Sequence, residues 1–160
     1  MIYSVLLNSR KPYRQNGSNS SVTYAQDWSF LPQDKHFRVS FSFHSTSDGQ
    51  LNADSLFYVT ADFTGSPVNY YANAPETPTA TSQRSLLNVS NIIGVIHSES
   101  SGPNNQNLVL RVNADDNYKI TLLNRPNNTF FTINLVKYDE ATFNLNAHYL
   151  MMLYFEEVRN

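Results

Sequence analysis

The sequence predicts an all-β protein, an antiparallel two-sheet sandwich built as a single jelly roll of about eight strands. The first observation is a period of two between apolar and polar residues, clearest from Phe37 to His44. A β-strand directs successive side chains to opposite faces, so such a segment has one face for a core and one for water. Composition agrees, because Asn and Ser supply 38 residues and Lys and Glu only 9. Asn and Ser favour turns, whereas Lys and Glu favour helix surfaces.

The N-terminal half contains three predicted main strands. Ile2–Leu7 is an apolar run that ends where the polar residues after it begin. Phe37–His44 alternates Phe or Val with Arg, Ser or His, and Ser55–Thr64 repeats this pattern. Val22–Tyr24 is an additional candidate for a short strand, because β-branched and aromatic residues suit pleated surfaces.

The C-terminal half continues the same period, with apolar residues at every second position of each segment. Turn-forming residues separate most of these segments. The five strands predicted here are Ile92–Ser98, Asn107–Val112, Tyr118–Leu123, Phe130–Lys137 and Tyr149–Glu157.

The connections between strands are of two kinds. Asn113–Asn117 and Asn124–Asn128 are short and rich in Asn, which predicts tight hairpin loops. Asn8–Ser21 and Ala72–Arg84 have no apolar period and are expected to be exposed loops of the kind that often carry function. No linker divides the chain, so we predict one domain over residues 1–160. Strand count favours a jelly roll, and an immunoglobulin-like sandwich without its cysteines is the alternative.

Composition excludes several classes of function. The chain has no Cys, and its net charge is -2 with only 15% charged residues. It therefore has no disulfide framework or thiolate metal site, and no basic surface for nucleic acid. No stretch reaches the roughly 20 apolar residues of a membrane span. The apolar start of the chain is too short for a signal peptide and is expected to form the first strand.

Sequence motifs for catalysis or metal binding are also absent. The four histidines are scattered, without the clustered His and Glu of a cupin-type metal site. The acidic stretch Asn113–Asn117 lacks the glycine and distal glutamate of an EF-hand, so a turn is the simpler interpretation than a calcium site. No Gly-x-Ser-x-Gly motif occurs. We therefore expect no catalytic residue, no metal and no cofactor, and a protein that is not an enzyme.

Aromatic residues beside the long loops are the candidates for contact with partners, because Tyr and Trp anchor many interfaces. Trp28 could instead be a lid on the core, and the sequence leaves both possibilities open. Proline in a loop lowers the entropy lost on ordering. The candidate interface residues are Tyr13, Tyr24, Trp28, Tyr70, Tyr71, Pro75 and Pro78.

The layout of the C-terminal half resembles a known group of proteins. Thr129–Lys137 is followed, after a polar spacer, by the apolar run His148–Val158, and a Leu-Leu-Asn-Arg-Pro turn precedes both. This is similar to the closing strands of small single-jelly-roll minor capsid or vertex proteins of large icosahedral DNA viruses. Phe37–Phe43 and Leu56–Phe63 lie where that family places its early strands. The resemblance covers about two-thirds of the chain and depends on layout rather than on a diagnostic motif.

The resemblance implies a structural capsid component, located in the virion and assembled in the host cytoplasm. Its expected partners are the major capsid protein, other capsid proteins and further copies of itself, as a homo-oligomer. A surface poor in Lys and Glu agrees, since both are depleted at interfaces. The alternative is a non-enzymatic binding module, either a trimeric ligand of the tumour-necrosis-factor type or a carbohydrate-binding domain. A cupin-like enzyme is a third possibility, disfavoured by the missing metal cluster.

Overall fold

The computed structural model describes residues 1–46, 56–62, 92–100, 108–112, 120–137 and 145–158. These residues form ten strands and no helix, so none of them belongs to a helix that could cross a membrane. In chain order the strands are β1 (Ile2–Asn8), β2 (Arg14–Gln15), β3 (Ser21–Ala25), β4 (Phe37–Ser45), β5 (Leu56–Ala61), β6 (Ile92–Ser100), β7 (Leu108–Val112), β8 (Ile120–Leu122), β9 (Phe130–Lys137) and β10 (Tyr149–Glu157).

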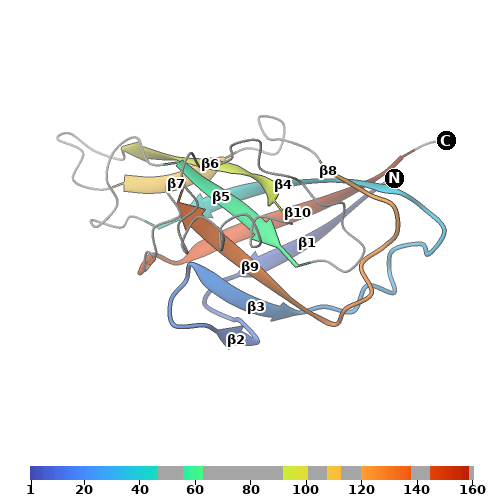
Figure 1. Ribbon diagram of the computed structural model, residues 1–160, viewed down its shortest axis with the longest axis horizontal. Coiled ribbons are helices and arrows are strands. Elements are labelled where there is room, and N and C mark those ends of the chain that lie inside the picture. Colours follow the sequence, from blue (N-terminus) through green and yellow to red (C-terminus); the bar gives the residue numbers. More distant parts are fainter. Residues whose placement is uncertain (47–55, 63–91, 101–107, 113–119, 138–144, 159–160) are drawn as a thin grey trace, which may run out of the picture.

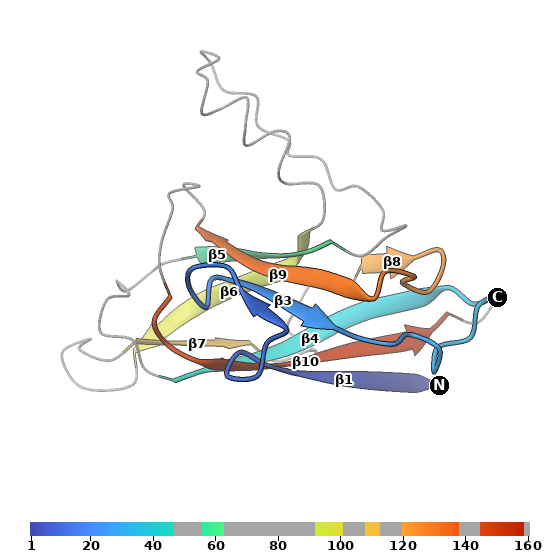
Figure 2. The same ribbon diagram turned by 90° about the horizontal axis from the view of Figure 1, so that it is seen from below.

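The strands form an antiparallel sandwich of two layers (Figure 1). One sheet has the order β1-β10-β4, with β7 and β8 paired to different stretches of the far side of β4. The other has the order β6-β5-β9-β3-β2. β7 also pairs with β6, so the hydrogen-bonded path runs from one sheet into the other. Figure 2 shows the layers from the side, with β5 and β9 above β10 and β1.

Both sheets place strands from the start of the chain beside strands from its end. In one sheet β1 and β4 lie on either side of β10, and in the other β3 and β5 lie on either side of β9. Long connections that cross between two sheets in this way are those of a jelly roll. The predicted fold class is therefore confirmed. All eight predicted main strands are present, and the short candidate at Val22–Tyr24 is also a strand. Only β2 was not predicted, because a pair of exposed polar residues gives no apolar signal.

Both predicted hairpins are wrong. β7 and β8 run in the same direction along one side of β4, where Val112 is opposite Phe43 and Ile120 is opposite Val39. They are two parts of one interrupted strand, and the Asn113–Asn117 stretch between them lies outside the described residues. The connection at Asn124–Asn128 leads from β8 beside β4 to β9 in the other sheet. Polar turn residues favour a change of direction but do not specify which strand is paired next.

The core lies between the sheets and is formed by the predicted apolar faces. In β4 the buried positions include Phe37, Val39, Phe41 and Phe43. Ser40, predicted to face water, is also buried; its cross-strand neighbour is Tyr154, a side chain large enough to cover a serine. The largest fully buried side chains are Phe37, Phe41, Phe43, Phe57, Phe131, Phe155, Leu31, Ile93, Ile96 and Leu122.

Candidate functional site

The structure separates the predicted contact residues into three groups. Tyr13 is 65% exposed, whereas Tyr24 and Trp28 are buried. Tyr24 lies in the core, where its hydroxyl group donates a hydrogen bond to the hydroxyl oxygen of Tyr149 at 3.1 Å. Of the seven candidates, only Tyr13 is a described residue with an exposed ring. The others, Tyr70, Tyr71, Pro75 and Pro78, lie outside the described residues.

Trp28 covers one end of the core. Its ring packs against Phe131 and Phe155, with centroids 5.3 and 5.5 Å away, and its indole N–H donates to the carbonyl oxygen of Asn128 at 2.8 Å. A buried indole normally needs such an acceptor. Trp28 is thus a lid on the core, the second of the two possibilities that its sequence context left open.

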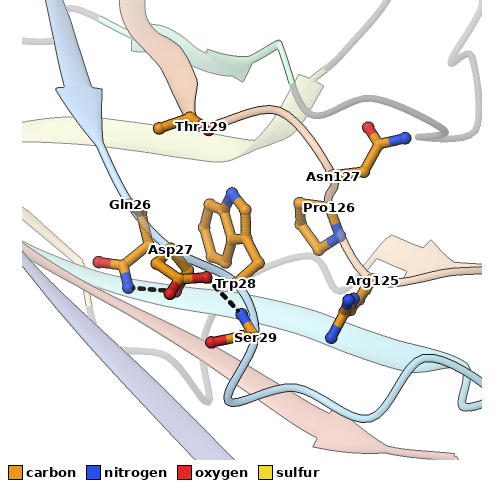
Figure 3. A pocket seen from close by; sticks show the side chains of 8 residues that line it. All are labelled: Gln26, Asp27, Trp28, Ser29, Arg125, Pro126, Asn127 and Thr129. Carbon is orange, nitrogen blue, oxygen red and sulfur yellow. Dashed lines mark hydrogen bonds between the residues drawn. The ribbon is translucent and has the colours of Figure 1, made fainter.

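A small hollow of about 190 Å³ lies beside Trp28 (Figure 3). Asp27 on one side accepts the backbone N–H of Ser29 at 2.9 Å. This bond is the main reason why the pKa of the Asp27 carboxyl group is lowered, and the positive charge of Arg125 acts in the same direction. Arg125 in turn donates to the carbonyl oxygen of Leu31 at 2.9 Å. Asp27 therefore stabilises its own turn, and Arg125 joins the connection between β8 and β9 to the segment before β4.

A second hollow, of about 430 Å³, lies at one end of β1, β4 and β10. His148 there has its Nδ1 atom 3.4 Å from the hydroxyl oxygen of Ser9 and 3.4 Å from the amide nitrogen of Asn19. Among the described residues, no group of three His, Cys, Asp or Glu could hold a metal ion. The hollow is lined by Asn8, Arg10, His44, Ser45, Thr46, His148, Tyr149 and Leu150.

The N-terminal segment Asn8–Ser21 was expected to be an exposed loop, and this is only partly correct. The residues from Tyr13 to Gly17 are exposed, but Ser18 and Asn19 are buried. The side-chain amide of Asn19 donates to the carbonyl oxygens of Asn146 and Ala147 at 3.2 and 2.9 Å. A polar segment can pack against its own domain when its amides satisfy buried carbonyl groups.

The outer face of the β1-β10-β4 sheet carries apolar side chains that the sequence analysis did not select. Ile2, Leu6 and Leu150 are 64%, 58% and 48% exposed. Leu6 is opposite Met152 in β10, which is half-buried. We call these four residues, together with the half-buried Tyr154, the apolar face. It lies on the solvent side of this sheet, opposite the core, and is bordered there by Ser4, Ser42 and the Arg38–Glu156 ion pair.

A signal for this face was present in the sequence. In β10 the inward positions are Tyr149, Met151, Leu153 and Phe155, but the positions between them are also apolar from Leu150 to Tyr154. A strand that is covered on only one side normally alternates with polar residues. Continuous apolar character therefore indicates a strand that is covered on both sides. The prediction depended on the inward positions alone and therefore concerned only one face of this strand.

The outer face of the other sheet differs in chemistry. Thr23 and Thr132 lie with their hydroxyl oxygens 3.0 Å apart. The hydroxyl group of Ser21 donates to the side-chain oxygen of Asn134 at 2.7 Å, and the amide of Asn134 donates to Thr60 at 3.4 Å. These polar groups satisfy one another across β3, β9 and β5. The two outer faces thus differ: one carries a cluster of apolar side chains bordered by polar residues, and the other carries a network of hydroxyl and amide groups.

One exposed aromatic pair lies at the rim of this second sheet. The rings of Tyr13 and Phe130 have centroids 4.5 Å apart, and Phe130 is 49% exposed. Tyr13 was a predicted contact residue, whereas Phe130 was predicted only as the first residue of the strand Phe130–Lys137. Phe130 begins β9 and has the opposite orientation to the buried Phe131.

Comparisons of this chain with protein-family models and with curated proteins find no match.

Proposed function

We propose that this protein is a structural capsid component, a minor capsid or vertex protein that assembles with the major capsid protein and with its own copies. The observation that carries the proposal is the apolar face on β1 and β10. Large exposed apolar patches on a folded domain mark surfaces that bind other proteins. The resemblance of the strand layout to small jelly-roll capsid proteins supplies the kind of partner.

The difference between the two outer faces supports the same role. A shell protein has one side against its neighbours and another toward solvent, and the apolar cluster on one face with the hydrogen-bonded polar network on the other suits that arrangement. The proposed role requires contact rather than chemistry, so no substrate or cofactor is part of it. The proposed location is the virion, after assembly in the host cytoplasm.

The experiment is quantitative mass spectrometry of virus particles purified through a density gradient. The proposal predicts that this chain sediments with the major capsid protein at a constant ratio across the particle peak. It also predicts that the chain remains after a high-salt wash, because apolar contacts are not screened by salt. If the chain is missing from the particle fractions while infected cells contain it, the capsid role is wrong.

A binding module remains a second candidate, favoured by the exposed pair of Tyr13 and Phe130. Aromatic rings on an open surface are typical of carbohydrate sites, where an amphipathic ring packs against a sugar. A glycan array with the purified protein separates the two proposals. Binding that Tyr13→Ala abolishes would favour the module, and the absence of any glycan signal would favour the capsid role.

A further inference from the structure

The β1 strand has one side paired with β10 and the other side open among the described residues. The backbone N–H of Ser9 donates to Tyr149 at 3.1 Å, and Glu157 donates to the carbonyl oxygen of Met1 at 2.9 Å. Hydrogen-bonded residues alternate along an antiparallel pair, so the odd-numbered residues of β1 bond to β10. The N–H and C=O groups of Ile2, Ser4 and Leu6 therefore point to the open side.

Within the described residues, β1 itself lacks the strand features that normally prevent pairing between molecules. Such features are charged residues, proline, bulges and very short edge strands. β1 has no charged residue and no proline, and its register with β10 is unbroken from Ile2 to Asn8. The opposite end of the path provides a contrast, because β2 has two residues, one of them Arg14. Of the two ends of the described strand path, the β1 end is the one suited to receive a further strand.

We infer that β1 pairs in antiparallel orientation with β1 of a second copy of this chain, around a two-fold axis at Ser4. Strand addition at an edge is a common mode of recognition, in which backbone groups supply the hydrogen bonds. This inference rests on the proposed role in assembly, because it names one of the partners and the way in which it binds.

The side chains of β1 fit a copy of themselves. With Ser4 on the axis, Ile2 of each copy lies opposite Leu6 of the other, and each serine lies opposite its equivalent. An isologous contact requires this kind of self-complementarity. Because the strand carries no charge, self-pairing brings no like charges together, which would otherwise oppose it.

The pairing also agrees with the position of the apolar face. Ile2 and Leu6 belong to that face, and Leu6 lies opposite Met152 in β10. A dimer joined through β1 has one continuous sheet, in the order β4-β10-β1 followed by the same three strands reversed. The apolar faces of the two copies then form one surface twice as large, available to a further capsid protein.

Cysteine trapping tests the inference, because the chain contains no Cys. Opposed residues in an antiparallel pair lie within the separation that a disulfide can span. The Ser4→Cys variant is expected to form an intermolecular disulfide about tenfold faster than a control, since pairing raises the effective thiol concentration. The control is Ser42→Cys, on the outer face of β4 and two strands away from the edge.

A second variant, Ser4→Pro, removes one N–H from the open side and leaves the β1–β10 bonds intact. Proline is tolerated on an edge strand in this orientation. Sedimentation velocity is expected to show a dimer for the unmodified protein and a folded monomer for this variant. If Ser4→Pro unfolds, the comparison of disulfide formation in Ser4→Cys and Ser42→Cys alone decides whether copies pair through β1.

Two results overturn the inference and are distinguishable from a failure of the capsid proposal. Faster trapping of Ser42→Cys than of Ser4→Cys shows that copies associate face to face rather than through β1. Slow trapping of both variants, with a monomer in sedimentation, shows that copies do not pair. In either case, the particle mass spectrometry still decides whether the chain is a capsid component.

Discussion

The hydroxyl group of Tyr24 on β3 donates to the hydroxyl oxygen of Tyr149 on β10 across the core, at a distance of 3.1 Å. Both side chains are buried. The two strands belong to different sheets, so this bond joins the layers of the sandwich through polar atoms. Burial raises the pKa of Tyr24 to about 12 and the pKa of Tyr149 well above its ordinary value.

A double-mutant cycle should show that the two tyrosines are coupled. Tyr24→Phe and Tyr149→Phe should each lower the free energy of unfolding by about 1–2 kcal/mol, because each leaves a buried hydroxyl without its partner. The double variant should lose less than the sum of the two, since it removes both groups at once. Urea unfolding measures all four proteins. Additive losses would show that the bond does not contribute.

Alkaline pH should destabilise the protein through the same pair. In the unfolded chain a tyrosine ionises near pH 10, whereas Tyr24 in the folded chain keeps its proton to about pH 12. The folded state therefore holds more protons between these values, and its stability falls as pH rises. Thermal unfolding from pH 9 to 12 should show a decline that is smaller in the Tyr24→Phe, Tyr149→Phe double variant. An equal decline in both proteins contradicts this.

The core register can be tested at two neighbouring positions of β4. Phe41 is fully buried, whereas Ser42 faces outward and is half-buried. Phe41→Ala should cost about 3–5 kcal/mol of stability because it leaves a large cavity. Ser42→Ala should cost less than about 1 kcal/mol. Similar losses at the two positions, measured by urea unfolding, would mean that the strand faces are assigned wrongly.

The packing of the N-terminal segment depends on Asn19. Asn19→Ala removes hydrogen bonds to two carbonyl groups near the start of β10 and should cost about 1–3 kcal/mol. Asn16→Ala is a matched control, because Asn16 is exposed and its side-chain amide donates to the hydroxyl oxygens of Ser21 and Thr23 at 3.4 and 3.2 Å. Limited proteolysis should cut the Asn19 variant faster between residues 8 and 21. Equal cleavage of both variants would contradict the role of Asn19.

The strands of this fold other than β2 could be predicted from the sequence because apolar residues recur at every second position. Phe130–Lys137 and Tyr149–Glu157 have the predicted bounds. Pairing between strands could not be predicted, as β7 and β8 show. The polar residues between them suit a hairpin, but in the described residues β7 and β8 both pair with β4 and not with each other.

The candidate site was less predictable for a related reason. Aromatic residues were selected by type, but burial decides which of them can bind, and it depends on distant segments such as Asn128 beside Trp28. The apolar face was not predicted, because the apolar residues on the inward faces of β1 and β10 were sufficient to predict these strands. Leu6 and Leu150, on the outward faces, were therefore not considered separately. The apolar residues at outward positions of β10 carry the signal for Leu150.

The central claim is that the apolar face is buried against other capsid proteins. The most direct measurement is the amount of chain in purified particles when tagged Leu150→Glu or Val95→Glu copies are supplied to infected cells. Leu150 lies on the apolar face, and Val95 is a similarly exposed apolar residue on β6 in the other sheet, 40% exposed against 48% for Leu150. Circular dichroism first establishes that both variants are folded. We then predict that Val95→Glu is incorporated into particles at the wild-type level and that Leu150→Glu is absent from them. Wild-type incorporation of Leu150→Glu would contradict the claim.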